Sequence, residues 1–468
     1  MNEIKNLPLT QNQTAIWLDE VFYGASSMYN IGAYYEIKGD FNPAVFSRAL
    51  EQAILESDSL GISIRQTEDG QAEQVFRIQE SYALPMLDFS GEGQPVSACE
   101  VWMDERFQQP FDISTSPLYD FALLKAGDGH YFWLMKMHHL IVDGWGFSVF
   151  TAKLSAYYNG MLGGLAESQP VFSYSDYVSA EVSYHGSEGF ARDRDYWLEK
   201  LKVLPGPLRE VRTADNMLHP VSKRQWKIPR GVYGRVEAYS AQQNVSVFHF
   251  WLGILATYLY RSTGQGRFCI GIPVVNRANR REKGTVGLFT GVSPLLVDIS
   301  ADMRFEDLLN QIKSTLRQDY RHQRYPIQEL VRRLRGELGD QDLYEVGFSY
   351  MQQDMELPLS GTNACFKMQS GNRSKMPLDI WIEDFSKEGD ILVDYYTSAG
   401  HYPEWEVDAM LSRMWVLMET VLAEAHDQPL GGINILPQPS ANCCWRPSTT
   451  RRRIIRVTRR LPNCLKNR

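Results

Sequence analysis

Two adjacent histidines and an aspartate are the residues of this chain whose types and spacing could do chemistry. They lie in the sequence MHHLIVDGWG at residues 137–146. A neutral imidazole can accept a proton near neutral pH, so His138 or His139 could act as a base. The carboxylate of Asp143 could hold the loop through an ion pair, cap a helix or take part in the chemistry. The alternative is a buried histidine pair in front of a capped helix.

A strand must position the two histidines. Residues 131–137 are apolar and aromatic apart from one lysine, which predicts a short buried strand. Successive strand residues point to opposite faces, so His138 and His139 cannot both face one cleft. The pair is therefore not a two-ligand metal site, and we expect one histidine to be packed inside and the other presented.

A helix is expected directly after the turn. Aromatic and apolar side chains recur at helical spacing from Phe147 to Tyr158, which places Asp143 or Gly144 at the N-cap. Gly144 gives the backbone room at the turn. Its amide, close to a helix N-terminus, could assist a developing oxyanion.

Length and composition bound the class of protein. The chain has 468 residues, of which 44% are hydrophobic, enough for two domains or lobes with substantial cores. We find no signal-peptide pattern and no apolar run long enough to span a bilayer, and we expect a cytoplasmic protein without a membrane role. The six cysteines include no CxxC pair, which argues against a zinc ribbon and a disulfide scaffold.

The charge is unevenly distributed. The net charge is −8, but residues 1–436 hold 39 Lys and Arg against 56 Asp and Glu, a balance of −17. This excess of acidic residues argues against nucleic-acid binding, which needs a basic surface. It also offers no net attraction to an acidic partner, so any docking patch for one must be local.

The residues from His138 to Gly144 resemble the HHxxxDG signature of the condensation domains of nonribosomal peptide synthetases. Weaker matches follow in the family's order over about residues 7–436, and this ordered series is more specific than any single match. They include Gln13 with Trp17, the segment 286–295 and the segment HQRYPIQE at 322–329, in which Arg324 replaces the acid of the family's HQDYPFE motif.

The resemblance implies an α/β (α+β) fold. Two lobes like chloramphenicol acetyltransferase would form a V-shaped pseudo-dimer, with the active site in a tunnel between them. The expected parts are an N-terminal lobe carrying the histidine motif, an inter-lobe connection, a C-terminal lobe and a basic, disordered tail, at residues 1–165, 166–189, 190–436 and 437–468. The tail has no counterpart in the family and suggests an out-of-frame or truncated end.

The resemblance also implies an acyltransferase that forms an amide bond. It would join a carrier-bound acyl or peptidyl thioester to the amine of an acceptor aminoacyl thioester. His139 is the presented histidine, as general base or as an orienting acceptor for the amine, and His138 is structural. With Asp143 and Gly144 they are the candidate catalytic residues. Candidate tunnel residues are Trp145, Gly287, Phe289 and Ser293.

The implied partners are peptidyl or acyl carrier proteins, for the donor and for the acceptor. Because the first motif begins near residue 7, we expect the donor in trans, with an adenylation domain on a neighbouring polypeptide. The chain itself would bind no cofactor or metal, and the 4′-phosphopantetheine comes on the carriers. Alternatives are an epimerisation-type domain, condensation with a free amine or alcohol, and a non-catalytic carrier-binding module.

One departure from the family concerns Asp143. In the family an arginine that pairs with this aspartate follows the first long helix, and the matching position here is Gly61. Arg65 is a possible substitute, which spacing alone cannot test.

Overall fold

The computed structural model describes residues 5–77, 81–164, 171–208, 217–339, 341–385, 389–423 and 428–437. Residues 1–437 belong to one compact unit. Nearly all of the expected tail, from residue 438 onward, lies outside the described residues. The unit is built on two large sheets, one for each expected lobe, and on a small sheet of three strands.

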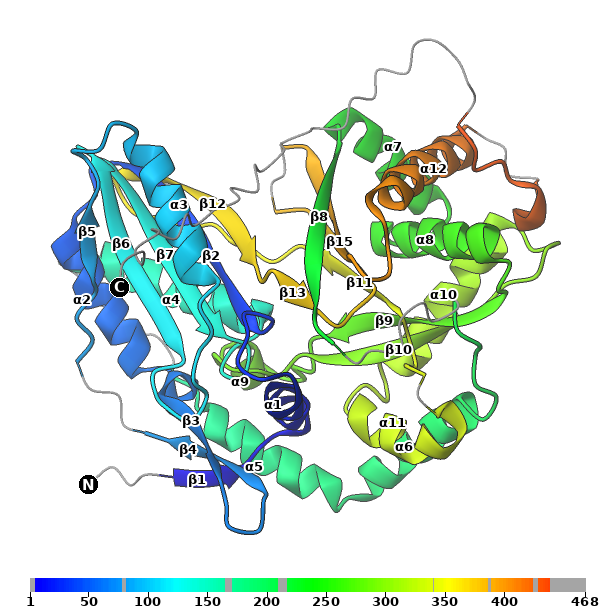
Figure 1. Ribbon diagram of the computed structural model, residues 1–468, viewed down its shortest axis with the longest axis horizontal. Helices are drawn as coiled ribbons and strands as arrows, with labels where there is room; N and C mark the ends of the chain where they lie inside the picture. Colours follow the sequence, from blue (N-terminus) through cyan, green and yellow to red (C-terminus); the bar gives the residue numbers. More distant parts are fainter. Residues whose placement is uncertain are drawn as a thin grey trace, which may run out of the picture. The chain divides into compact units, whose positions relative to one another are not determined.

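The first large sheet carries the histidine motif. Its strand order is β12-β2-β7-β6-β5, antiparallel except for the β5–β6 pair (Figure 1). The outer strand β12 comes from the second half of the chain, so the two halves share this sheet. The strands are β2 (Asn30–Gly39), β5 (Met86–Asp88), β6 (Tyr119–Gly127), β7 (His130–His138) and β12 (Thr362–Ser370).

Helices cover both faces of this sheet, which explains why β7 is apolar on both sides. Helix α3 packs against β6 and β7 on one face, and the paired helices α2 and α4 cover the other (Figure 1). In β7, Phe132 and Leu134 therefore join the α3 core, whereas Trp133 and Met135 join the α2/α4 core. The helices are α2 (Pro43–Leu55), α3 (Pro95–Phe107) and α4 (Gly144–Gly163).

The second large sheet has the strand order β10-β9-β11-β14-β15-β8-β13. Strand β11 is parallel to both of its neighbours, and the other pairs are antiparallel. The strands are β8 (His219–Ile228), β9 (Arg267–Val274), β10 (Gly291–Asp298), β11 (Val346–Met351), β13 (Arg373–Ser374), β14 (Leu378–Glu383) and β15 (Ile391–Ser398).

Four helices pack together beside this sheet, around the buried helix α8. Helix α8 is apolar along nearly its whole length. Ser246 caps its N-terminus, and Gly264, in the left-handed conformation, caps its C-terminus. The helices are α7 (Arg230–Gln242), α8 (Val247–Thr263), α10 (Phe305–Asp319) and α12 (Glu404–Leu422).

The remaining elements surround the junction of the two halves (Figure 1). The expected inter-lobe connection at 166–189 contains a regular helix, and the exact lobe boundaries stay a prediction. The small sheet consists of β1 (Lys5–Pro8), β3 (Ile62–Gln66) and β4 (Ala72–Phe76). The helices are α1 (Gln11–Tyr23), α5 (Tyr174–His185), α6 (Glu188–Lys200), α9 (Arg280–Lys283) and α11 (Ile327–Leu338), and two 3-10 turns lie at Asp58–Gly61 and Leu430–Gly432.

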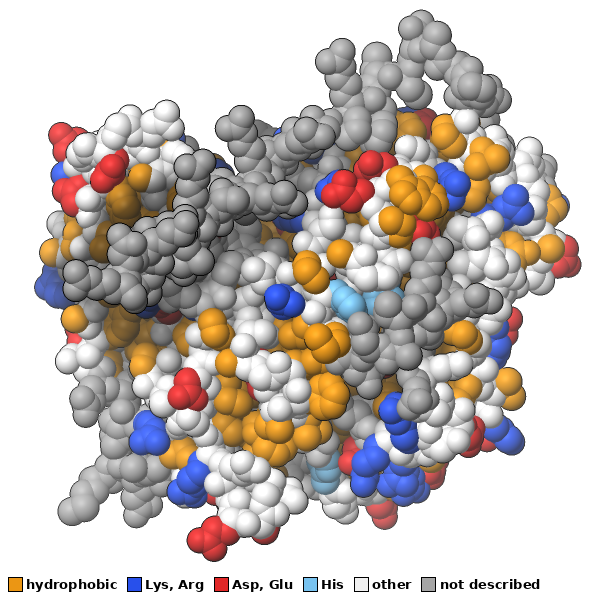
Figure 2. Space-filling model, in the orientation of Figure 1, with side chains coloured by type: hydrophobic (Ala, Val, Ile, Leu, Met, Phe, Trp, Pro, Cys, Tyr) orange, Lys and Arg blue, Asp and Glu red, His pale blue; other side chains and the backbone are white. Residues whose placement is uncertain are grey.

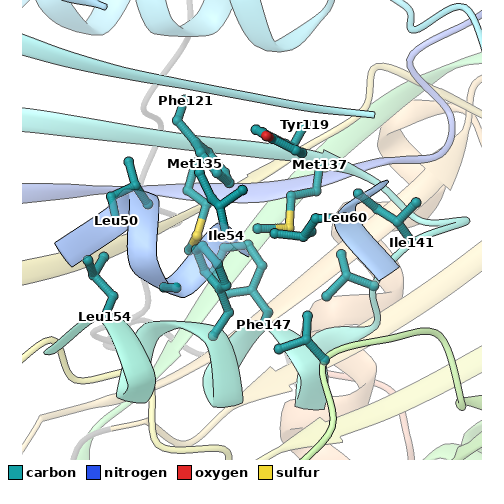
Figure 3. Packing of buried hydrophobic residues seen from close by; sticks show 14 of the residues in the cluster. Leu50, Ile54, Leu60, Tyr119, Phe121, Met135, Met137, Ile141, Phe147 and Leu154 are labelled. Atoms are coloured by element: carbon teal, nitrogen blue, oxygen red, sulfur yellow. The ribbon is translucent and has the colours of Figure 1, made fainter. Parts of the chain in front are cut away.

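The core under the histidine strand is densely packed (Figure 3). Leu50 and Ile54 of α2 and Phe147 of α4 lie against Phe121 and Met135 of the sheet. All five side chains are at most 2% exposed. Burial of this kind fixes the position of β7, and so of the residues that follow it.

We predict that Phe121→Ala lowers the free energy of unfolding by about 3–5 kcal/mol, because it leaves a cavity among stacked aromatic rings. Urea denaturation followed by circular dichroism would measure the change. Val101→Ala, at a side chain that is 54% exposed, is the control and should change stability little. A loss below about 1 kcal/mol for Phe121→Ala would contradict the packing described.

Candidate active site

The two histidines stand at the end of β7. The amide of His139 donates to the carbonyl of Tyr29 (2.8 Å), and the amide of Ile141 donates to the carbonyl of His138 (3.1 Å). These bonds continue the strand into a tight turn. His138 is 1% exposed and His139 is half-buried, so the two side chains differ as strand alternation predicts.

His138 is built into the wall of the first half. Its Nδ1 accepts a hydrogen bond from the amide of Leu140 (3.2 Å), and its Nε2 lies 3.5 Å from Oε1 of the buried Glu20. Because Nδ1 accepts, the proton of the neutral ring is on Nε2, facing this carboxylate. The rings of Tyr29 and Phe111 pack beside it. These contacts hold the imidazole in place and leave it no access to a substrate.

His139 is the histidine available for chemistry. Burial lowers its pKa, and the charge of Asp143 and the nearby backbone oppose this only in part. The imidazole is therefore neutral at physiological pH and can accept a proton. Its Nδ1 is buried and forms no hydrogen bond with the described residues.

Asp143 closes the turn that follows. It is the N-cap of α4, where its Oδ1 accepts from the amide of Gly146 (2.7 Å). Its Oδ2 accepts from the amides of Phe289 and Thr290 (2.9 Å each) and from the hydroxyl of Thr290 (3.0 Å). The same carboxylate thus caps a helix of the first half and binds the backbone of the second.

Arg277, which follows β9, neutralises this aspartate. Its Nη2 lies 2.9 Å from Asp143 Oδ1, and both side chains have no exposed surface. The guanidinium also donates to the carbonyls of Thr285 (2.7 Å) and Gly287 (3.2 Å), and it stacks 3.8 Å above the ring of Phe289. Burial alone would raise the pKa of Asp143, but the charge of Arg277 and the amide donors outweigh it and hold the pKa below its usual value.

This arrangement corrects the expectation about Arg65. Arg65 is an exposed residue of β3 that pairs with Glu73 across the strand (2.8 Å) and makes no contact with Asp143. The partner is Arg277, which the sequence analysis missed. The available signal was an arginine two residues after the apolar run at 268–275.

Gly146 permits the tight approach of the two halves. A Cβ at Gly146 would meet the backbone of Gly287 at 3.0 Å, so a larger residue would push the halves apart. Gly144 is the first residue of α4, and its amide is not hydrogen-bonded within the described part of the chain. That amide is available at a helix N-terminus, as expected for an oxyanion donor.

Two of the four candidate tunnel residues bind the backbone or the side chain of Asp143. Gly287 accepts a hydrogen bond from the Asp143 amide (3.2 Å), and a Cβ there would lie 2.2 Å from the ring of Tyr174. Phe289 is fully buried beneath Arg277. Both residues belong to the wall behind the site, and a role of theirs in a tunnel stays a prediction.

The other two candidate tunnel residues lie apart. The indole of Trp145 donates to the carbonyl of Lys283 (2.8 Å), which is another link between the halves. Ser293 is a buried residue of β10 whose hydroxyl has no hydrogen-bond partner among the described residues. A tunnel role for Trp145 and for Ser293 stays a prediction.

The described residues were searched for metal-binding groups and for membrane-spanning helices. No group of three or more His, Cys, Asp or Glu side chains among them could hold a metal ion. None of their helices is long and apolar enough to cross a bilayer.

The fold and the strand-borne histidine define an acyltransferase with two lobes of the chloramphenicol acetyltransferase type. The family model of the condensation domain matches residues 3–442. The chain therefore belongs to the condensation domains, which form amide bonds on thioester substrates in nonribosomal peptide synthetases. The sequence-based expectations of family, fold and reaction are thus confirmed.

Similar proteins are multidomain synthetases. The chain is 26% identical to the dimodular nonribosomal peptide synthase of Bacillus subtilis over 436 residues, or 92% of this chain and 18% of that protein. It is 24% identical to the isonitrile lipopeptide synthase of Streptomyces coeruleorubidus, over 91% of this chain and 29% of that protein. The chain spans less than a third of either relative.

Solved structures agree over most of the chain. A mutant of the starter condensation domain of rhizomide synthetase RzmA, in complex with C8-CoA and Leu-SNAC, superimposes with a TM-score of 0.82 at 26% identity, covering 92% of this chain and 98% of that one. The first condensation domain of the calcium-dependent antibiotic synthetase, bound to a substrate analogue, gives a TM-score of 0.81 at 20% identity, covering 92% and 99%. The second likeness concerns the fold alone.

We predict that Arg277→Met costs about 3–5 kcal/mol in the free energy of unfolding, because it leaves the Asp143 carboxylate buried without its counter-charge. The double variant Asp143→Asn/Arg277→Met should cost less than the sum of the two single variants. Arg65→Met is the control and should cost less than about 1 kcal/mol, since that ion pair is exposed. Denaturation curves of the four variants would measure these differences. Additive losses would contradict the pairing.

The lowered pKa of Asp143 predicts a specific pH dependence. A carboxyl whose folded-state pKa is depressed adds stability above its unfolded-state pKa, about 3.9, and loses it as the pH falls through the folded value. The double variant lacks this group, so its free energy of unfolding should fall less steeply below about pH 4. Denaturant titrations between pH 7 and pH 3 would compare the two proteins. If the free energy of unfolding changed with pH in the same way for both proteins, the pKa of Asp143 would not be lowered in the folded state.

Proposed function

We propose that His139 accepts the proton of the acceptor amine during amide-bond formation by this condensation domain. The observation that carries the proposal is the state of its ring. It is half-buried, its pKa is lowered, and its backbone is fixed between Tyr29 and the Asp143 turn. A base that stays neutral suits an amine nucleophile near neutral pH.

The proposed reaction needs little more than positioning and proton transfer, because a thioester is already activated. The acceptor amine attacks the donor carbonyl, a C–N bond forms, and the amine proton passes to His139. The oxyanion of the tetrahedral intermediate would be stabilised by the Gly144 amide at the start of α4. The C–S bond then breaks, and the imidazolium returns its proton to the leaving thiolate. Binding both substrates in one site supplies much of the rate.

We also propose how the substrates arrive. Both would come as thioesters on 4′-phosphopantetheine arms, on donor and acceptor carriers that act in trans. An adenylation domain of a neighbouring polypeptide would load the acceptor. The chain itself would bind no cofactor. The proposal rests on membership of a family that works with carrier proteins.

Further proposals concern place and organisation. We propose a cytoplasmic site of action, supported by the free thiols of Cys99, Cys269 and Cys365 among the described residues. We propose lobes at 1–165 and 190–436 with a substrate tunnel between them. Trp145 is a candidate for its lining, since its indole donates a hydrogen bond to the opposite half.

We predict that His139→Ala lowers kcat by about 10²–10⁴-fold. The assay would combine acyl-carrier and aminoacyl-carrier partners, supplied as separate polypeptides, and detect the amide by mass spectrometry. His185→Ala on α5 is the control and should keep the wild-type rate. Exchange of the aminoacyl α-hydrogen without amide product would instead indicate epimerisation. An unchanged rate for His139→Ala would show that His139 is not the base.

The pH dependence of the reaction gives a second test. A base must be deprotonated to act, so the rate falls as the pH drops through its pKa. Because the pKa of His139 is lowered, the acid limb of kcat/KM should have its midpoint below the ordinary histidine value of about 6.5. Measuring kcat/KM from pH 5 to pH 9 with a small thioester would locate it. A midpoint above pH 7 would show that the group titrating in this limb is not His139 with a lowered pKa.

A further inference from the structure

The two faces of the second large sheet differ in burial. On one face, Phe348, Ile380 and Tyr395 are at most 2% exposed, because the helices around α8 cover it (Figure 1). On the other face, Ser349 of β11 and Trp381 of β14 are only half-buried, although both strands lie in the middle of the sheet. The central strands therefore keep accessible surface on this second side, which we call the open face.

Three acids and a tryptophan lie together on the open face. Asp379, Trp381 and Glu383 occupy alternate positions of β14, so their side chains share one side of the strand. Asp394 of β15 is the direct cross-strand partner of Trp381 and therefore points to the same side.

Asp394 shows how this face holds an ammonium group. Its carboxylate is fully buried and lies 2.5 Å from Nζ of Lys223 on β8. The same ammonium lies 5.2 Å from the centre of the Tyr396 ring. A carboxylate and an aromatic ring thus bind a cation here, which is the combination that suits a protonated amine.

Asp379 and Glu383, which we call the acid pair, have no such cation. Asp379 accepts from the indole of Trp381 (2.7 Å) and is paired with no Lys, Arg or His of the described residues, and burial raises its pKa to about 6. Glu383 is 9% exposed, and no described amide, hydroxyl or cation donates to its carboxyl. Burial and the charge of Asp394 raise its pKa, and Lys223 offsets this only in part. Two acids beside Trp381 therefore lack a counter-charge.

Contacts lead from the acid pair to the histidine wall. Burial raises the pKa of Tyr344, and nearby acids, Asp379 and Asp19 of α1 among them, raise it further, so this ring is close to both. The Asp19 carboxylate accepts a hydrogen bond from the hydroxyl of Tyr29. The carbonyl of Tyr29 binds the amide of His139 (2.8 Å). The open face and the proposed base are thus connected through neighbouring side chains.

The surroundings of Asp19 are apolar. Helix α1 lies at the junction of the halves (Figure 1), and Figure 2 shows hydrophobic side chains gathered in this part of the view. Leu18, Val21 and Phe22 of α1 are exposed. Apolar surroundings lower the local dielectric and strengthen the attraction between a carboxylate and an ammonium. An aliphatic chain that ends in an ammonium group suits this combination of apolar and acidic groups.

We propose that the acid pair binds a protonated amino group on the side chain of the acceptor aminoacyl thioester. The acceptor is then a diamino acid, such as a lysyl or ornithyl group. Its α-amine reacts at His139, and its side-chain ammonium is held by Asp379 and Glu383 beside the ring of Trp381. The inference rests on the proposed function, and it names the acceptor class for that reaction.

The acid pair also disfavours uncharged acceptors. A neutral side chain would cover the two acids without supplying a counter-charge, and desolvating an unpaired carboxylate is costly. Glu383 can avoid this cost by holding a proton, because its pKa is raised. Asp379, with a pKa of about 6, is mostly ionised at pH 7. Asp379 is therefore the stronger determinant of acceptor charge.

The test compares lysyl and norleucyl acceptors on the same carrier, because norleucyl has the aliphatic chain without the ammonium. Each is assayed with the wild type and with Asp379→Asn/Glu383→Gln. Both substitutions keep the size of the side chain, and an asparagine at 379 can still accept from Trp381. The matched control is Glu92→Gln/Asp128→Asn, the same charge change at exposed residues of the first half. Circular dichroism would check that the variants fold.

We predict that the wild type prefers lysyl to norleucyl by at least about tenfold in kcat/KM. The acid-pair variant should lose this preference, mainly through a higher KM for lysyl, and the control should keep it. A general loss of activity would lower both rates and leave their ratio unchanged. An equal ratio in the acid-pair variant and the wild type would overturn the proposal. A loss confined to free 1,5-diaminopentane would also overturn it, since it would assign the acid pair to a free diamine.

Calorimetry with lysinamide and norleucinamide tests binding without the reaction. Lysinamide should bind the wild type at least about tenfold more tightly than the acid-pair variant, and norleucinamide should bind both alike. If no acceptor gave an amide but lysinamide binding still depended on the acid pair, the proposed function would fail and the cation site would hold. Lysinamide binding that is absent, or independent of the acid pair, would overturn the site.

Discussion

The buried ion pair between Asp143 and Arg277 is the constraint on which the site depends. Two charges without exposed surface are costly to desolvate, and this cost is offset by their mutual attraction together with further hydrogen bonds. The carboxylate accepts hydrogen bonds from the guanidinium, three backbone amides and one hydroxyl. Because these partners come from both halves of the chain, the pair can be satisfied only when the halves are correctly joined. Its satisfaction therefore sets the geometry of the turn that carries His139.

The same constraint explains the small residues around it. Gly146 lies against the backbone of Gly287, and Gly287 lies against the ring of Tyr174. A side chain at either position would separate the carboxylate from its donors. Packing against Phe289 then shields the ion pair from water, which strengthens it. The residues behind the histidine thus form a rigid support, whereas His139 itself keeps part of its surface accessible.

Local signals in the sequence predicted much of this site. The apolar run before His138, the alternation of strand residues and the capping aspartate all act within a few residues, so the sequence pattern is sufficient to find them. Arg277 was missed because its bond spans 134 residues along the chain, and no local pattern reports such a pairing. The helix α5 was missed for a similar reason. It contains few periodic apolar residues, and its first turn is capped by Asp58, 116 residues away, so its stability comes from tertiary contacts.

The electrostatics of the site bear on how substrates are recognised. His139 is neutral because burial lowers its pKa, and the charge of Asp143 is cancelled at 2.9 Å by Arg277. The centre therefore has little net field of its own, which suits an uncharged thioester and a neutral amine. Such a centre cannot attract a charged carrier over long distances. Selection of the carrier must then lie with surface charges away from the chemistry. Separating the two tasks lets docking depend on ionic strength while the chemical step does not.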